Sequence, residues 1–145
     1  METKEYEKQL NIKEVRIGNI VYGSWDDQDE DGEDVIRYSL CKITGVDENG
    51  ELGEGWSYML ENMESPDTDY YGGLYGVELN EDWLLNLGFE KVNYTFWAKG
   101  LAVHNHDIVS FYMLYEQNRT YIKYVHQLQN LYFALTGEEL KIKES

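Results

Sequence analysis

The order of apolar and polar positions predicts mainly extended structure in the first half of the chain. Two segments, residues 15–22 and 35–46, are rich in β-branched and aromatic residues or alternate apolar with polar positions, as strands do. Asn49 and Gly50 between apolar segments are a strong hairpin signal. We therefore expect the chain to turn back there and to form a third strand near residues 56–60.

The second half of the chain repeats this extended pattern. Tyr94, Phe96 and Ala98 alternate with their neighbours, and residues 108–115 are apolar nearly throughout, as in a central strand. The region from residue 93 to 116 therefore predicts two or three further strands.

Two segments predict helices. Asn80 can cap a helix of about two turns, whose first turn carries acidic residues that suit the positive end of the helix dipole. From residue 125 onward, apolar side chains recur at spacings of three and four, which predicts an amphipathic helix over 124–136 ending at Gly137. Its expected buried residues are Val125, Leu128, Leu131 and Leu135.

These elements predict an α+β fold in a single domain spanning residues 1–145. Six to eight short strands would form a bent antiparallel sheet or a small β-barrel, with two helices packed on it. Residues 1–14 predict a short helix or a mobile arm, and residues 138–143 a short final strand. Residues 26–34 predict an acidic solvated loop, and residues 64–76 a loop rich in Gly and Tyr.

The charge of the chain limits the classes of partner that it can bind. With 28 acidic and 12 basic residues, the formal net charge is −16. Such a surface repels the phosphate backbone, so we expect no nucleic-acid binding. Acidic surfaces steer basic protein partners and can imitate DNA toward a DNA-binding protein, although a well-solvated surface explains the charge equally.

Composition excludes several other classes. The chain is 42% hydrophobic and 14% aromatic, so it is not disordered. The lone Cys41 excludes a disulfide framework and a multi-cysteine zinc site. No apolar run approaches the roughly 20 residues of a membrane span, and the first residues lack the apolar stretch of a signal peptide. We therefore expect a cytoplasmic protein that does not bind membranes.

Two segments contain residues that could bind a metal. The acidic residues from Asp27 to Gly32 match the opening of a calcium loop, but Tyr38 stands where the bidentate Glu belongs. A plain acidic loop is the favoured interpretation. His104 and His106 share one face of an expected strand and could bind zinc, yet the remaining ligands would have to come from scattered positions. A polar strand end is therefore favoured over a metal site.

Catalytic motifs are missing from the sequence. It has no Gly-x-Ser-x-Gly elbow and no phosphate-binding glycine loop, because Gly72-Gly73 is not followed by Lys-Ser or Lys-Thr. Cys41 falls within an expected strand and suggests a small buried side chain. We therefore expect no enzymatic activity and no cofactor.

The 13 tyrosines and 4 tryptophans are the remaining functional signal, because such side chains dominate binding surfaces. Tyr70, Tyr71 and Tyr75 stand among glycines in an expected loop, as in a binding site for a protein or a purine base. The alternative is that most of these rings cover a small sheet.

A second candidate site is the polar side of the last expected helix. His126, Gln129 and Asn130 could read a ligand there. A histidine satisfied by local hydrogen bonds is the favoured alternative.

Three blocks of the sequence resemble a known family. Residues 123–140 (KYVHQLQNLYFALTGEEL) resemble the C-terminal signature of uncharacterised small proteins from phages and mobile elements of gut anaerobic bacteria. Residues 12–19 and 79–89 resemble the other two blocks of that family. The resemblance implies a phage or mobile-element origin, and it brings no site residues with it.

Together these observations favour a non-enzymatic, phage-encoded binding protein. It would inhibit a host defence protein or sequester a small nucleotide-type signal. Alternatives are a metal-dependent hydrolase using His104 and His106, or a structural or assembly component of the particle. The sequence is also compatible with a homo-oligomer.

Overall fold

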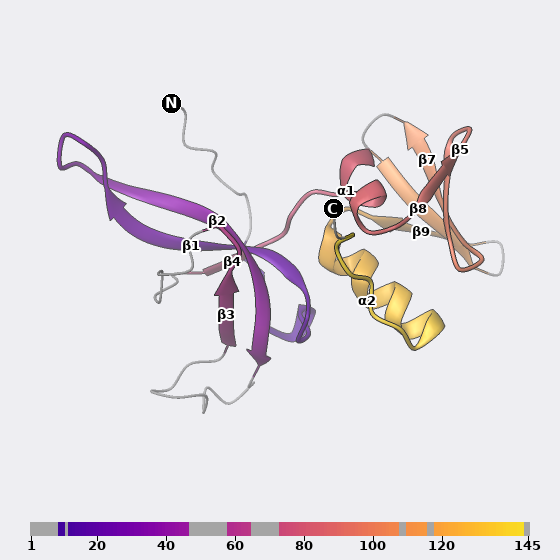
Figure 1. The fold of residues 1–145 in the computed structure, drawn as a ribbon, viewed down its shortest axis with the longest axis horizontal. Coiled ribbons are helices and arrows are strands. Elements are labelled where there is room, and N and C mark those ends of the chain that lie inside the picture. The colour runs from indigo at the N-terminus through magenta and orange to yellow at the C-terminus, as the bar shows by residue number, and fades with distance from the viewer. Residues whose placement is uncertain are drawn as a thin grey trace. The chain divides into compact units, whose positions relative to one another are not determined.

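The computed structural model in Figure 1 describes residues 9–10, 12–46, 58–64, 73–107, 110–115 and 118–143. These residues form nine strands and two α-helices, and the strands make two antiparallel sheets. The expected sheet-rich α+β class is confirmed. In the described part of the chain, the first and last strands of each sheet do not pair with each other. Neither sheet there is therefore a closed barrel. None of the helices there is long and apolar enough to cross a membrane.

The chain divides into two compact units, Met1–Val77 (unit 1) and Glu78–Ser145 (unit 2). Each is described by itself below. The expectation of a single domain stays a prediction.

Unit 1 is a four-stranded sheet with the order β3-β2-β1-β4. Its elements are η1 (Ile12–Glu14, a 3-10 turn), β1 (Ile20–Gln28), β2 (Asp34–Val46), β3 (Tyr58–Asn62) and β4 (Gly73–Tyr75). The expected second and third strands are confirmed. The first begins at Ile20 rather than at residue 15 and extends to Gln28. The Asn49-Gly50 turn lies outside the described residues.

The acidic loop is shorter than the predicted range 26–34. β1 pairs with β2 along the whole length of β1, from Ile20 opposite Lys42 to Gln28 opposite Asp34, so only residues 29–33 connect the two strands. Charge repulsion does not open the hairpin because the strands share a backbone ladder, and because Asp27 binds Arg37 through an Oδ2–Nε contact of 2.5 Å.

The core of unit 1 lies under β1, β2 and β4. It consists of Val15, Val21, Ile43 and Leu74, with Leu10, Val46, Tyr58 and Leu60 packed against them. Leu74 belongs to β4, so the predicted loop 64–76 extends too far: residues 73–75 form a strand. Residues 65–72 of the predicted loop lie outside the described part of the chain.

The predicted arm over residues 1–14 is docked where it is described. The amide of Leu10 donates to the carbonyl of Leu74 over 2.7 Å, and Gln9 pairs with Tyr75 in an antiparallel bridge. A Cβ on Gly73 would lie 2.6 Å from the side-chain nitrogen of Gln9, so a larger residue at this position would have to displace the end of the Gln9 side chain.

Unit 2 is a five-stranded sheet in which each strand pairs with the next along the chain. Its elements are α1 (Glu81–Asn86), β5 (Glu90–Val92), β6 (Thr95–Ala98), β7 (Leu101–Asp107), β8 (Ser110–Tyr115), β9 (Asn118–Ile122) and α2 (Val125–Thr136). The sheet has one buried face, formed by Phe96, Val103, Phe111, Met113 and Ile122.

Both helices lie in unit 2, and their predicted ends are confirmed. The side chain of Asn80 accepts a hydrogen bond from the amide of Trp83 over 2.8 Å, which caps α1. Gly137 ends α2 with a φ of 74°, a left-handed conformation that favours glycine.

The buried face of α2 differs from the predicted one. Val125 and Leu128 are fully buried, but Leu131 is only half-buried and Leu135 is 42% exposed. The residues that complete the buried face are His126, Gln129 and Tyr132. The stripe therefore runs through positions 125, 128, 129 and 132, which is the spacing of a helix face.

The residues after α2 form no strand, so the predicted final strand over 138–143 is wrong. They run as an extended segment that Leu140, 7% exposed, anchors in the protein. The amide of Lys143 also donates to the carbonyl of Asn86 over 2.5 Å. The segment thus docks through one apolar side chain and a single backbone contact at the end of α1.

Candidate functional site

The predicted tyrosine site is only partly described. Tyr70 and Tyr71 lie outside the described residues. Tyr75 is half-buried in β4, pairs with Tyr22 of β1, and packs edge-on against Tyr38 with 5.4 Å between ring centroids. Burial raises the pKa of the Tyr58 hydroxyl, and nearby Tyr75 raises it further. Tyr75 is thus part of the sheet of unit 1, as the alternative interpretation of these tyrosines proposed.

The predicted polar stripe on α2 is not exposed. His126 and Gln129 are 2% and 1% exposed, and Asn130 is half-buried. The ring of His126 stacks on Tyr124 with 5.6 Å between centroids. His126 and Gln129 face the interior because the helix periodicity places them beside Val125 and Leu128, so they cannot read a ligand from solvent.

The acidic hairpin does not have the geometry of a calcium loop. Strands flank it, Asp27 binds Arg37, and one carboxylate oxygen of Asp29 accepts the amides of Asp31 and Glu33, each over 2.9 Å. In these contacts the carboxylates stabilise the turn of the hairpin.

The pKa of Asp27 gives a test of this hairpin. The backbone amide of Gln28 and then the side chain of Arg37 lower that pKa below its ordinary value. The lowered pKa means that the carboxylate stabilises the hairpin above about pH 3.9, the usual unfolded value. That contribution is lost as the pH falls through the folded value. In the Arg37→Gln variant we expect the pKa of Asp27 to rise, measured by NMR titration of its carboxyl carbon. An unchanged pKa would mean that the ion pair does not form in solution.

Of the two histidines proposed as a metal-binding pair, only His104 has a described side chain. The ring of His104 stacks on Tyr112 at 5.2 Å, and its Nδ1 lies 3.4 Å from the hydroxyl of Thr95. The side chain of His106 lies outside the described residues. Among the side chains that are described, no group of three or more His, Cys, Asp or Glu could hold a metal.

The structure brings together a surface that sequence reasoning missed, on the face of the unit 2 sheet opposite its core. Strand register aligns five residues into one row across β5 to β9: Val92, Thr95, His104, Tyr112 and Tyr121. Neighbouring positions on the same face carry Glu90, Trp97, Ala102, Leu114 and Arg119. We call these ten residues the outer sheet face.

Rings are in contact along the centre of the outer sheet face. Tyr112 contacts His104 on one side, and Tyr121 on the other with 5.7 Å between centroids. The guanidinium carbon of Arg119 lies 4.7 Å from the centroid of the Tyr112 ring. A hydrogen bond with Tyr121 raises the pKa of Arg119 above its ordinary value. The arginine is therefore held as a cation over an aromatic row.

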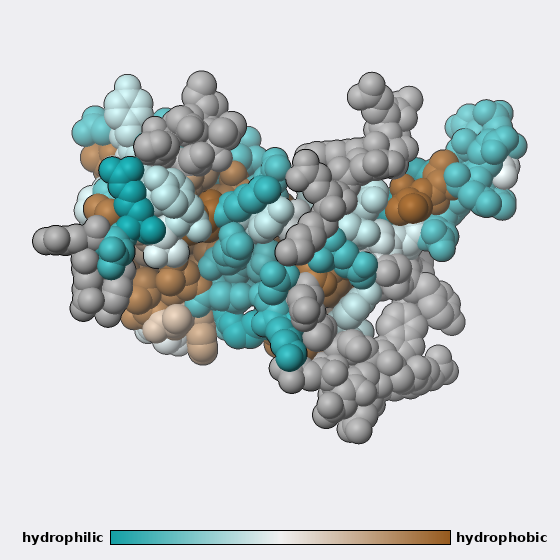
Figure 2. Space-filling view, turned by 180° about the vertical axis from the view of Figure 1, so that it is seen from behind, coloured by the Kyte–Doolittle hydropathy of each residue, from teal (hydrophilic) through white to brown (hydrophobic). Residues whose placement is uncertain are grey.

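Much of this face is open to solvent. Val92, Leu114 and Tyr121 are 55%, 52% and 54% exposed, and Trp97 is 44% exposed. On the face shown in Figure 2, the described residues form a mostly hydrophilic surface with several hydrophobic patches. Single exposed apolar side chains are common in proteins. The outer sheet face differs in that its apolar and aromatic residues are adjacent across consecutive strands.

Charge is distributed unevenly between the two units. Unit 1 contains 19 acidic and 6 basic residues, a net charge of −13, whereas unit 2 contains 9 and 6, a net charge of −3. The exposed aromatic face therefore belongs to the less acidic unit. The sequence shows the charge asymmetry directly, but only strand register shows that the rings line up.

Comparison with known proteins adds no relative. No protein-family model matches the chain, and no curated protein and no solved structure shows significant similarity to it.

Proposed function

We propose that this chain is a non-enzymatic binding protein that uses the outer sheet face of unit 2 to contact a partner protein with a basic surface. The observation that supports this best is the row of His104, Tyr112 and Tyr121 with Arg119 over its centre. Tyrosine, tryptophan and arginine are the residues that most often carry binding energy in protein interfaces.

The shape of the surface favours a protein over a small molecule. The outer sheet face is one side of an open sheet, and its largest apolar side chains stand exposed on neighbouring strands. Small ligands bind in concave sites that bury most of their surface. An open surface with exposed aromatic and apolar side chains matches the core of a protein interface better.

The charge of the chain favours a basic partner. A net charge of −16 attracts a positively charged surface from a distance and repels nucleic acid. With the phage origin that the three sequence blocks imply, the partner would be a host protein, and binding would inhibit it.

Paired surface variants test this proposal. The chain is immobilised and exposed to bacterial lysate, and captured proteins are identified and then purified for affinity measurement. Leu114→Ser/Tyr121→Ser removes two side chains from the outer sheet face. Phe133→Ser/Leu135→Ser removes two side chains of α2 that are 39% and 42% exposed, as a matched control. We expect the first variant to bind at least about tenfold more weakly, because truncating an interface hot spot costs about 2 kcal/mol or more and a tenfold change corresponds to about 1.4 kcal/mol.

The identity of the partner completes the test. A basic partner whose affinity falls with salt and falls in the outer-face variant supports the proposal. Equal affinity of parent and outer-face variant, or equal losses in both variants, contradicts it. Binding of a free nucleotide that is lost in the outer-face variant would instead support sequestration of a small signal.

A further inference from the structure

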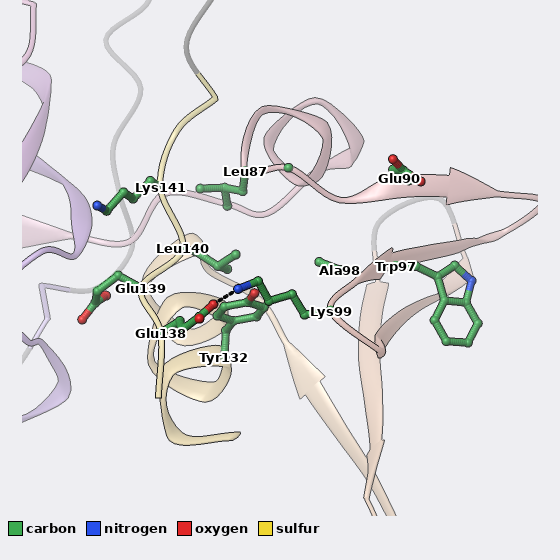
Figure 3. A pocket seen from close by; sticks show the side chains of 11 residues that line it. Leu87, Glu90, Trp97, Ala98, Lys99, Tyr132, Glu138, Glu139, Leu140 and Lys141 are labelled. Atoms are coloured by element: carbon green, nitrogen blue, oxygen red, sulfur yellow. Dashed lines mark hydrogen bonds and ion pairs between the residues drawn. The ribbon is translucent and has the colours of Figure 1, made fainter. Parts of the chain in front are cut away.

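Unit 2 also contains a pocket of about 530 Å³ that is separate from the centre of the aromatic row. It lies between the end of α1, the β5–β6 hairpin, α2 and the extended segment after α2 (Figure 3). Its volume is within the range of about 300–1,000 Å³ that is usual for small-ligand sites. The pocket is therefore large enough for a small organic molecule.

The floor of this pocket is apolar. Leu87, Tyr132 and Leu140 line it and are 3%, 4% and 7% exposed. They come from three separate parts of unit 2: the end of α1, the middle of α2 and the segment after it. The ring of Phe89 contacts the ring of Tyr132 edge-on, with 6.3 Å between their centroids. A ligand would therefore place an apolar group here.

An ion pair lies at the edge of this floor. The side chains of Lys99 and Glu138 point toward each other and form a salt bridge (Figure 3). They are 58% and 54% exposed. An exposed ion pair of this kind contributes only about 0–1 kcal/mol, so a ligand that satisfies both charges can separate it at little cost.

The other charges of the lining also have both signs. Glu90, Glu139 and Lys141 line the pocket beside Lys99 and Glu138. A pocket lined by both positive and negative side chains has no strong preference for a ligand with only a negative or only a positive charge. It suits a molecule that carries both charges close together.

We propose that this pocket binds a free α-amino acid with a large apolar side chain. Lys99 would bind its carboxylate, Glu138 would bind its ammonium group, and the side chain would lie against Leu87, Tyr132 and Leu140. The two charges of an α-amino acid are separated by a single carbon, which matches the adjacent opposite charges of Lys99 and Glu138. The five side chains proposed to contact the amino acid are not part of the outer sheet face, so this inference does not depend on the partner proposed there.

Calorimetric titration of the full chain with L-phenylalanine and L-leucine tests this proposal. The same protein is titrated with 2-phenylethylamine, which lacks the carboxylate, and with 3-phenylpropionate, which lacks the ammonium group. We expect saturable binding of the amino acids and about threefold or more weaker binding of each analogue, since each loses one charged contact with an exposed side chain, worth about 0.7 kcal/mol.

Charge-neutral variants locate the site. Lys99→Gln and Glu138→Gln are expected to weaken amino-acid binding about threefold or more, whereas Asp82→Asn and Lys123→Gln, at two exposed charges of unit 2 that do not line the pocket, serve as matched controls. All four side chains are exposed, so folding is preserved and is checked by circular dichroism. Absence of amino-acid binding, equal binding of either analogue, or equal effects of the two variant pairs would overturn the proposal.

Discussion

Replacing Leu128 by Asp is expected to unfold unit 2. Leu128 is completely buried in the middle of α2. The variant loses the packing of a large apolar side chain and places a carboxylate where no charge partner is described. Loss of a buried leucine alone costs about 2–5 kcal/mol, and the buried charge adds to that cost. We therefore expect a loss of more than about 4 kcal/mol, which approaches the total stability of a small domain.

Urea denaturation measures this loss, and hydrogen exchange locates it. Amides of α2 and of the unit 2 sheet should lose their protection in the Leu128→Asp variant. Leu135→Asp is the matched control, because Leu135 lies on the same helix and is 42% exposed. It should change the stability by no more than about 0.5 kcal/mol. If the two variants are equally stable, the buried face of α2 has been assigned wrongly.

The second large effect is expected from Phe96→Ala. Phe96 is fully buried in β6 and contacts Phe111 of β8 edge-on, with 6.3 Å between ring centroids. Removing a buried phenylalanine ring leaves a cavity and costs about 3–5 kcal/mol. Thermal and urea unfolding of the variant would measure this cost.

The control for Phe96 is the next residue along the strand. Trp97 points to the opposite face and is 44% exposed, so Trp97→Ala should cost less than about 1 kcal/mol. This contrast tests the register of the unit 2 sheet. A larger loss for Trp97→Ala than for Phe96→Ala would show that the faces of β6 are reversed.

The elements that the sequence predicts correctly have local signals. Asn80 caps α1 and Gly137 ends α2, because a side-chain acceptor and a left-handed glycine act on their own neighbours. Residues 110–115 form a strand within the apolar run 108–115. These choices depend on propensity and spacing, so one sequence is enough to make them.

The candidate sites were harder to predict because exposure depends on distant residues. His126 and Gln129 are polar, and the sequence permits a ligand-reading surface there, although it favours a histidine satisfied by local hydrogen bonds. In the protein they are buried, since the tertiary structure of unit 2 covers that side of α2. The sequence predicts a loop at Tyr75, whereas pairing with β1 makes this residue part of a strand.

The sequence alone therefore determined the sheet-rich class, the ends of both helices and the strong acidity of the first half of the chain. The tertiary structure decided which strands share a sheet, which side of α2 is buried, and that His104, Tyr112 and Tyr121 form one row. The physical reason is that capping and periodicity act over a few residues, whereas register and burial are set by contacts between segments far apart in the chain. A shift of one residue in strand pairing would turn the rings of a strand to the other face, and only the folded sheet fixes that register.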